Sequence, residues 1–183
     1  MEYENFLINT YFGRLDLEPF NHFKDFESTE TTRGIIRKFL EANSKYPPSL
    51  LEEQGMVPAD LMEKLGRNDF FGLTIPHKYG GVGLSLNQYL HVVETLASQN
   101  MSLGILALAH LSIGIKGIVL FGSEAQKRKY LAPAATGDMI FSYALTEPQT
   151  GSDAQHIETF ATESEDGRHY ILNGTKTYIT NAN

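Results

Sequence analysis

The chain has 183 residues, which is enough for one ordinary domain or for one domain and part of another. Its formal net charge is −7 and it has no dense basic cluster, which argues against nucleic acid as its main partner, because phosphate neutralisation needs gathered Lys and Arg side chains. It contains no cysteine, which excludes disulfides and thiol chemistry.

The first 25 residues mix aromatic and polar side chains without a clean period. We interpret residues 1–25 as an N-terminal extension that lies on another part of the protein. This stretch has no basic start followed by an apolar core, and it is not rich in arginine and poor in acidic residues. We therefore expect neither a secretory signal nor a mitochondrial leader within it.

Helical periodicity predicts an α-helical domain over residues 26–137. Ser28 is the expected N-cap of a helix that continues to Ala42. Pro58 is the expected first residue of another helix, which Gly66 should end.

Two further helices have clear start signals. Ser85 should cap the first, and the sequence Ser123-Glu124-Ala125-Gln126 is a capping box for a helix that continues to about Ala135. The inward face of the helix after Ser85 should hold Leu86, Leu90, Val93 and either Leu96 or Ala97.

Residues 101–121 form an apolar run that approaches the length of a membrane span. His110 and Lys116 make insertion costly, so we interpret the run as a buried core helix. His110 could line a ligand pocket, but we favour a core histidine bonded to backbone groups. For Lys116 we favour a side chain that reaches back to solvent.

After Gly137 the period changes, and residues 138–183 are expected to begin an antiparallel β-domain. The expected strands are 139–145, 158–163, 168–172 and 175–181. Residues 164–167 and the pair Asn173-Gly174 are the expected hairpin turns. The last strand would end as an unpaired edge, so the predicted fold is mainly α, followed by a truncated antiparallel β-domain.

The loop after the first expected strand carries polar groups suited to holding a flat polar ligand. Thr146 and Ser152 supply hydroxyls, while Gly151 permits close backbone approach. An ordinary polar turn accounts for the same composition. Glu147 precedes a proline, and we favour a structural carboxylate over a catalytic one. No histidine has partners at metal-ligand spacing, so no metal site is expected.

Four stretches, in order, resemble the acyl-CoA dehydrogenase family: 71–85, 121–137, 143–153 and 172–181. The resemblance covers roughly residues 28–183. It implies a full-length enzyme with an α-bundle, a β-barrel and a second α-bundle, and FAD bound between the last two. It also implies a homo-oligomer, either a dimer or a tetramer.

The resemblance also implies a set of site residues. The implied flavin-binding residues are Tyr143, Leu145, Thr146, Ser152, Tyr178, Ile179 and Thr180, with Thr180 near N5 of the flavin. Ser152 and Gly151 are the implied contacts to the acyl-CoA substrate. Two departures from the family pattern are Tyr178, where many relatives carry Trp, and 181–183, where glycines are commoner.

The implied reaction is α,β-dehydrogenation of a fatty acyl-CoA to trans-2-enoyl-CoA, as in fatty acid β-oxidation. An electron-transfer flavoprotein is the implied electron acceptor. The family's catalytic Glu belongs to the C-terminal bundle, so no catalytic residue is expected in this chain. Features such as the sequence 109–117 resemble the very-long-chain branch.

The implied location is the cytoplasm of a bacterium, or the mitochondrial matrix if a leader has been removed. Two alternatives remain open. An acyl-CoA oxidase shares the fold but reoxidises its flavin with O2, and a helical interaction module would bind a partner without catalysis.

Overall fold

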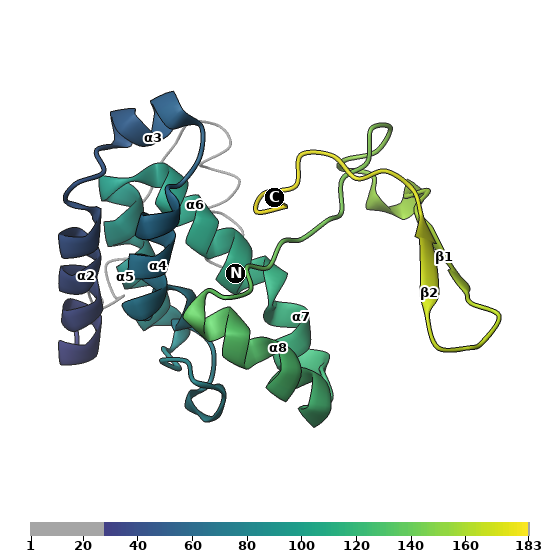
Figure 1. The fold of residues 1–183 in the computed structure, drawn as a ribbon, viewed down its shortest axis with the longest axis horizontal. Helices are drawn as coiled ribbons and strands as arrows, with labels where there is room; N and C mark the ends of the chain where they lie inside the picture. The colour runs from purple at the N-terminus through teal and green to yellow at the C-terminus, as the bar shows by residue number, and fades with distance from the viewer. Residues whose placement is uncertain (1–27, 183) are drawn as a thin grey trace, which may run out of the picture.

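The computed structural model describes residues 28–182, so the predicted extension 1–25 lies outside the described residues. A helical domain comes first, and an extended segment then leads to a two-stranded hairpin (Figure 1). The helices are α2 (Glu30–Asn43), α3 (Pro48–Gln54), α4 (Ala59–Arg67), η2 (Phe70–Gly72), η3 (His77–Tyr79), α5 (Leu86–Gln99), α6 (Met101–Leu108), η4 (Ala109–Gly114), α7 (Lys116–Phe121), α8 (Glu124–Thr136) and η5 (Ala154–His156). The strands are β1 (Phe160–Glu163) and β2 (Tyr170–Asn173).

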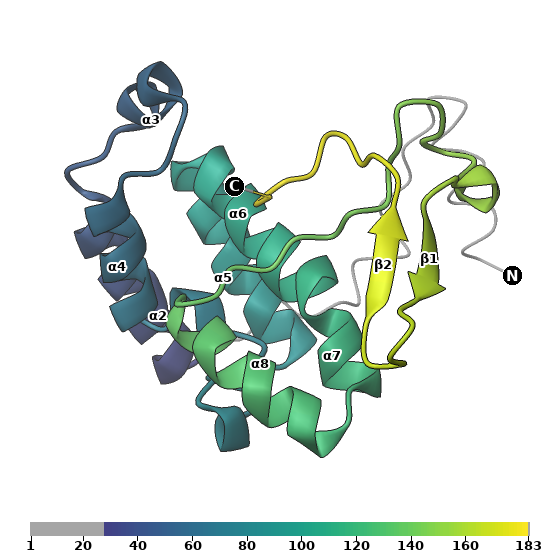
Figure 2. The same cartoon turned by 45° about the vertical axis from the view of Figure 1, so that its right-hand side comes forward.

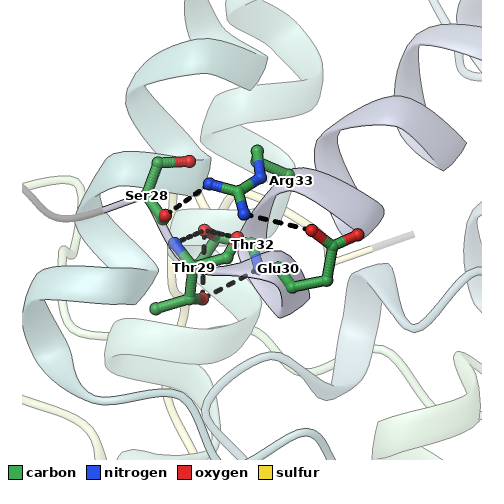
Figure 3. Close-up of polar contacts among 5 residues, drawn as sticks. All are labelled: Ser28, Thr29, Glu30, Thr32 and Arg33. Atoms are coloured by element: carbon green, nitrogen blue, oxygen red, sulfur yellow. Dashed lines mark hydrogen bonds and ion pairs between the residues drawn. The ribbon is translucent and has the colours of Figure 1, made fainter.

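The N-terminus of α2 is closed by a capping box, but the cap is Thr29 and not the predicted Ser28. Thr29 accepts from the amide of Thr32, and the Thr32 hydroxyl accepts from the amide of Thr29 (Figure 3). Ser28 contributes its carbonyl to the Arg33 guanidinium at 2.7 Å. Thr29 is the cap because Thr32, three residues later, exchanges side-chain-to-amide hydrogen bonds with it.

Helix α4 begins after Pro58, which is the N-cap and not the predicted first helical residue, and it continues past Gly66 to Arg67. Gly66 therefore does not end the helix. A Cβ atom at position 66 would lie 2.3 Å from the carbonyl oxygen of Thr136, at the end of α8. The glycine is needed because α4 and α8 approach each other closely there.

Helix α5 starts at the predicted cap, Ser85, with Gln88 completing a capping box. Its inward face differs from the prediction, since Leu86 is 68% exposed and Leu90 is 41% exposed. The buried residues are Tyr89, Val92, Val93 and Leu96. The stripe is displaced because Tyr89, which carries a hydroxyl, still turns inward and shares a hydrogen bond of 2.8 Å with Ser112.

The run 101–121 is one continuous helical stretch, but it is not a uniform α-helix. Its middle, η4, is a π-helix, in which the amide of Ile115 donates to the carbonyl of His110, five residues back. By length and composition this run is the one stretch of the described residues that could cross a membrane. Its first part packs against α5, and Leu103, Ala107 and Ile115 are fully buried. Helix α7 has no buried residue, so the prediction of a buried core helix is confirmed only for the stretch before it.

A single apolar core fills the helical domain. Phe39, Phe70 and Phe71 form successive ring contacts inside it, with centroids 5.8 and 5.1 Å apart. Other fully buried side chains are Leu61, Leu65, Leu73, Ile75, Leu96, Leu103, Leu111, Ile115 and Leu131. This core packs the helices of the domain together, and the extended segments that follow lie against them.

The hairpin β1–β2 is antiparallel, with Phe160 opposite Asn173, and confirms the predicted pair of strands around residues 164–167. The other predictions for the β-region were wrong in part. Residues 139–145 and 175–181 are extended but form no strand, and Asn173-Gly174 is not a hairpin turn. Tyr178 and Asn181 have positive φ values of 56° and 65°, which interrupt the alternation that a strand needs.

Candidate functional site

Two extended segments, 141–147 and 176–181, lie side by side between the hairpin and the helical domain (Figures 1 and 2). The amide of Thr177 donates to the carbonyl of Thr146 at 3.0 Å. At the other end, Asn181 Nδ2 donates to the carbonyl of Phe141 at 3.3 Å. The two stretches therefore run antiparallel, and they bring the sequence-predicted residues of both motifs together.

Two tyrosines project from these segments toward solvent. Tyr143 is 52% exposed, and Tyr178 is 92% exposed with a left-handed backbone. Tyr178 therefore keeps almost all of its contact with water, and Tyr143 keeps about half. The exposed face of each ring is free to pack against a further planar group.

The remaining predicted residues have different exposures. Leu145, Thr146 and Ile179 are half-buried, whereas Thr180 and Ser152 are exposed. Exposed hydroxyls can donate to or accept from a ligand, so Thr180 and Ser152 are the available polar side chains of this set.

The loop after segment 141–147 is a tight turn. The amide and carbonyl of Glu147 pair with the carbonyl and amide of Thr150, at 2.9 and 3.1 Å. The Thr150 hydroxyl then donates to the carbonyl of Asp153 at 2.7 Å. This turn presents Gly151 and Ser152 at the surface. A Cβ atom at position 151 would meet no described atom within 4 Å, so no contact among the described residues requires a glycine there.

Glu147 is the polar centre of the site, and its side chain is buried. Its carboxylate accepts from Lys176 Nζ at 2.7 Å and from the amides of Glu158 and Thr159 at 2.7 and 3.0 Å. Gln149 adds a fourth donor at 2.9 Å. The Lys176 ammonium, followed by the donors of Thr159 and Glu158, lowers the pKa of Glu147 to about 2.

These contacts confirm Glu147 as a structural carboxylate. An acceptor with a pKa of about 2 and four donors is a poor general base, since a base works best when its pKa lies near the operating pH. Lys176 also donates to the carbonyl of Leu145 at 2.9 Å. The ion pair between Glu147 and Lys176 thus links segments 141–147 and 176–181.

A cavity of about 350 Å³ lies on the hairpin side of Glu147. It is lined by Glu147, Pro148, Gln149, Glu158, Thr159, Phe160, Asn173, Gly174 and Thr175. None of the residues predicted to bind a flavin or a substrate lines it, so this cavity is separate from the two tyrosines.

His110 is confirmed as a core histidine. Its ring is fully buried, Nδ1 accepts from the amide of Phe141 at 3.0 Å, and Nε2 is 3.2 Å from the carbonyls of Phe71 and Ala134. Burial lowers the pKa of His110, and the neutral ring with its proton on Nε2 satisfies all three backbone groups. Among the described residues no group of three His, Cys, Asp or Glu side chains could hold a metal ion.

Sequence reasoning missed two residues of this site. Lys176 and Asn181 each donate to backbone carbonyls of segment 141–147, yet neither was predicted to have a role. Asn181 was noted only as part of a departure from the family pattern. An asparagine that follows an extended hydroxyl-bearing stretch is a signal for a left-handed turn, and this signal could have found it.

Comparison with known proteins agrees with this fold. Residues 27–138 match the family "Acyl-CoA dehydrogenase, N-terminal domain", and residues 142–183 match "Acyl-CoA dehydrogenase, middle domain". The chain belongs to the acyl-CoA dehydrogenase family.

The similar proteins include a mitochondrial very long-chain specific acyl-CoA dehydrogenase from Bos taurus, 37% identical over 97% of this chain and 28% of the relative. Butyryl-CoA dehydrogenase from Megasphaera elsdenii superposes with a TM-score of 0.77, at 33% identity over 87% of this chain and 43% of that chain. An acyl-CoA dehydrogenase from Bacillus anthracis, solved in complex with FAD, gives a TM-score of 0.75 at 35% identity, over 87% of this chain and 28% of that chain.

The residues of this site fit a flavin. The amides of residues 142–146 bond to no acceptor in the described part of the chain, although the carbonyls of Leu145 and Thr146 are both used. An extended stretch with free amide donors, beside an exposed aromatic ring and exposed hydroxyls, matches a planar ligand that is rich in acceptors.

Proposed function

We propose that this chain forms part of an FAD-dependent acyl-CoA dehydrogenase that acts on long-chain fatty acyl-CoA thioesters. The observation that supports the proposal most directly is the antiparallel pairing of segments 141–147 and 176–181, which presents Tyr143 and Tyr178 with open faces. The chain spans 28% of the length of the Bos taurus relative, so the activity belongs to the full-length gene product.

In this proposal the chain's own residues bind and orient the cofactor. Tyr143, Leu145 and Thr146 contact the flavin from segment 141–147, and Tyr178, Ile179 and Thr180 contact it from segment 176–181. Ser152 contacts the flavin phosphate and, with Gly151, the acyl-CoA arm. FAD, when bound, would supply the acceptor for a hydride from the β-carbon of the thioester, and the Thr180 hydroxyl would donate a hydrogen bond to the flavin.

The base that removes the α-proton is assigned to a part of the protein outside residues 28–182. Glu147 is unsuitable because its carboxylate is buried among four donors. We propose an electron-transfer flavoprotein as the electron acceptor and a homo-oligomer as the working form. The proposed location is a bacterial cytoplasm or a mitochondrial matrix.

Purification of the full-length gene product tests the proposal. We expect a yellow protein that absorbs near ~450 nm, the usual flavin band, and that is bleached without oxygen by a long-chain acyl-CoA faster than by butyryl-CoA. A colourless protein that takes up no FAD would contradict the proposal. Rapid reoxidation of the bleached protein by O2, with release of peroxide, would indicate an acyl-CoA oxidase instead.

A further inference from the structure

Asn181 connects the site to the helical domain through its side chain. It follows Thr180 directly, and its Nδ2 donates to the carbonyl of Leu106 in α6 at 3.2 Å and to that of Phe141 at 3.3 Å. Its backbone is left-handed, with a φ of 65°. Gly and Asn adopt this conformation most readily, and of the two only Asn also supplies a side-chain donor.

The peptide groups of Phe141 are held on both sides. The amide donates to His110 Nδ1, and the carbonyl accepts from Asn181. His110 is fixed in turn because its Nε2–H is shared between the carbonyls of Phe71 and Ala134. A Cβ atom at Gly114 would lie 2.8 Å from the Cβ of Phe141, so this glycine lets Phe141 approach the π-helix η4.

The helical domain therefore reaches segment 176–181 through one chain of hydrogen bonds. It runs from Ala134 and Phe71 through His110 and the backbone at Phe141 to Asn181. The hydrogen bond from Asn181 to the carbonyl of Leu106 connects the segment to α6 as well. In the described residues, the other bonds of segment 176–181 go to residues 145–147 and not to helices.

We propose that Asn181 is a positioning residue for the flavin reaction. Its two hydrogen bonds fix the backbone next to Thr180 relative to α6 and Phe141, and so hold the Thr180 hydroxyl and the Tyr178 ring at a constant place beside the cofactor. This inference rests on the proposed function, because it assigns Thr180 and Tyr178 to the flavin.

The substitutions Asn181→Gly and Asn181→Asp separate the two properties of the residue. Glycine keeps the left-handed backbone and removes both donors. Aspartate keeps the shape but turns an acceptor toward two carbonyl oxygens. Asp69→Gly is a matched control, since Asp69 also has a left-handed backbone, with a φ of 66°, and lies in the helical domain away from the site.

Both variants are compared with wild type and control as full-length protein. We expect FAD to bind about tenfold more weakly to Asn181→Gly, the change that loss of about 1.4 kcal/mol produces. We expect the rate of flavin reduction to fall while KM for acyl-CoA changes less than about twofold, because the lost contacts act on the cofactor. Asn181→Asp should be impaired at least as strongly.

Two readouts do not depend on activity. The amides of residues 178–180 in the FAD-free protein should exchange hydrogen faster in Asn181→Gly than in wild type, because the anchor is gone. The visible circular dichroism of the bound flavin should change in both Asn181 variants and stay unchanged in Asp69→Gly.

The outcomes separate the two proposals. If wild type binds no FAD, the proposed function fails and this inference fails with it. If wild type binds FAD and oxidises acyl-CoA while Asn181→Gly matches it in affinity, rate and exchange, only the positioning role is overturned. Equal losses in Asp69→Gly and Asn181→Gly would also overturn it, since the effect would then be one of general stability.

Discussion

A single imidazole, His110, satisfies three buried backbone groups that come from three parts of the chain. The rings of Phe71 and Phe141 contact its ring, and none of the salt bridges among the described residues involves it. Replacement by phenylalanine keeps the ring contacts and removes every polar partner. Buried groups left without partners cost far more than the bonds themselves contribute.

We predict that His110→Phe lowers the free energy of unfolding by about 1–3 kcal/mol, the usual cost of an unsatisfied buried group. Thermal or urea unfolding measures the loss. His169→Gln, at an exposed histidine, should change it by less than about 0.5 kcal/mol. Equal effects of the two substitutions would contradict the buried role.

The same residue predicts a dependence on pH. The pKa of His110 is lowered by burial from its ordinary value of 6.5, so the unfolded chain binds its proton first as the pH falls. Wild type should therefore lose stability as the pH drops below about 6.5. The stability of His110→Phe should not show this loss. If the free energy of unfolding falls equally in both proteins between pH 7 and pH 5, the prediction is wrong.

Glu147 predicts a second, more acidic transition. Its pKa is about 2 in the folded protein, against an ordinary value of 4.5. The stability that it contributes is complete above about pH 4.5 and is lost as the pH falls toward 2. Glu147→Gln should remove this dependence and lower the melting temperature at neutral pH. Glu30→Gln, which breaks an exposed pair with Arg33, should change the melting temperature little.

The sequence predicted that His110 and Glu147 have structural roles, but it did not predict their hydrogen-bond partners. His110 in an apolar helix and Glu147 before a proline were both interpreted as structural, and the contacts confirm this. Their partners lie 24 to 39 residues away for His110 and 29 residues away for the ion pair of Glu147. No local pattern records such pairings, because they depend on how the helices pack.

Helix boundaries were predictable where a local signal exists. The capping boxes at Ser85 and Ser123 begin α5 and α8 as expected, because each cap and its partner are three residues apart. The apolar stripe of α5 was misplaced at Leu86 and Leu90, since which leucine turns inward is decided by neighbouring helices. The role of Gly66 was missed for the same reason, because α8 lies far along the sequence.

Two glycines within helices therefore give opposite predictions. Gly66→Ala should lower the free energy of unfolding by about 1–3 kcal/mol, because the new methyl group collides with the carbonyl of Thr136. Gly34→Ala in α2 places no atom of residues 28–182 within 4 Å of the new Cβ and should raise the free energy of unfolding by about 0.5–1 kcal/mol. Chemical denaturation of both variants measures the contrast. A loss at both positions would contradict the difference in packing.

Across the described chain, large apolar side chains are exposed on both the hairpin and the helical domain. The hairpin exposes Tyr170 and Leu172, 72% and 73% exposed, and the helical domain exposes Leu86 and Met101. Contiguous exposed apolar surface on a folded protein marks a place where another surface packs. A two-stranded hairpin with both faces in water also has little stability of its own.

We predict that the 183-residue chain, expressed by itself, associates at high concentration through these surfaces. Leu172→Lys should reduce the association measured by light scattering. Gln155→Lys adds the same charge at an exposed polar position of η5 and should reduce it less. If both lysines act equally, net charge and not apolar contact controls the association.

The π-helix η4 sets the rotational register of everything after it. Removing one residue from Ala109–Gly114 would allow residues 101–121 to close as a regular α-helix, with i to i−4 bonds throughout. The following turn would then rotate by about 100° and shift by about 1.5 Å. Ile115, now fully buried, would leave the core, and the groove that Gly114 offers to Phe141 would turn away with it.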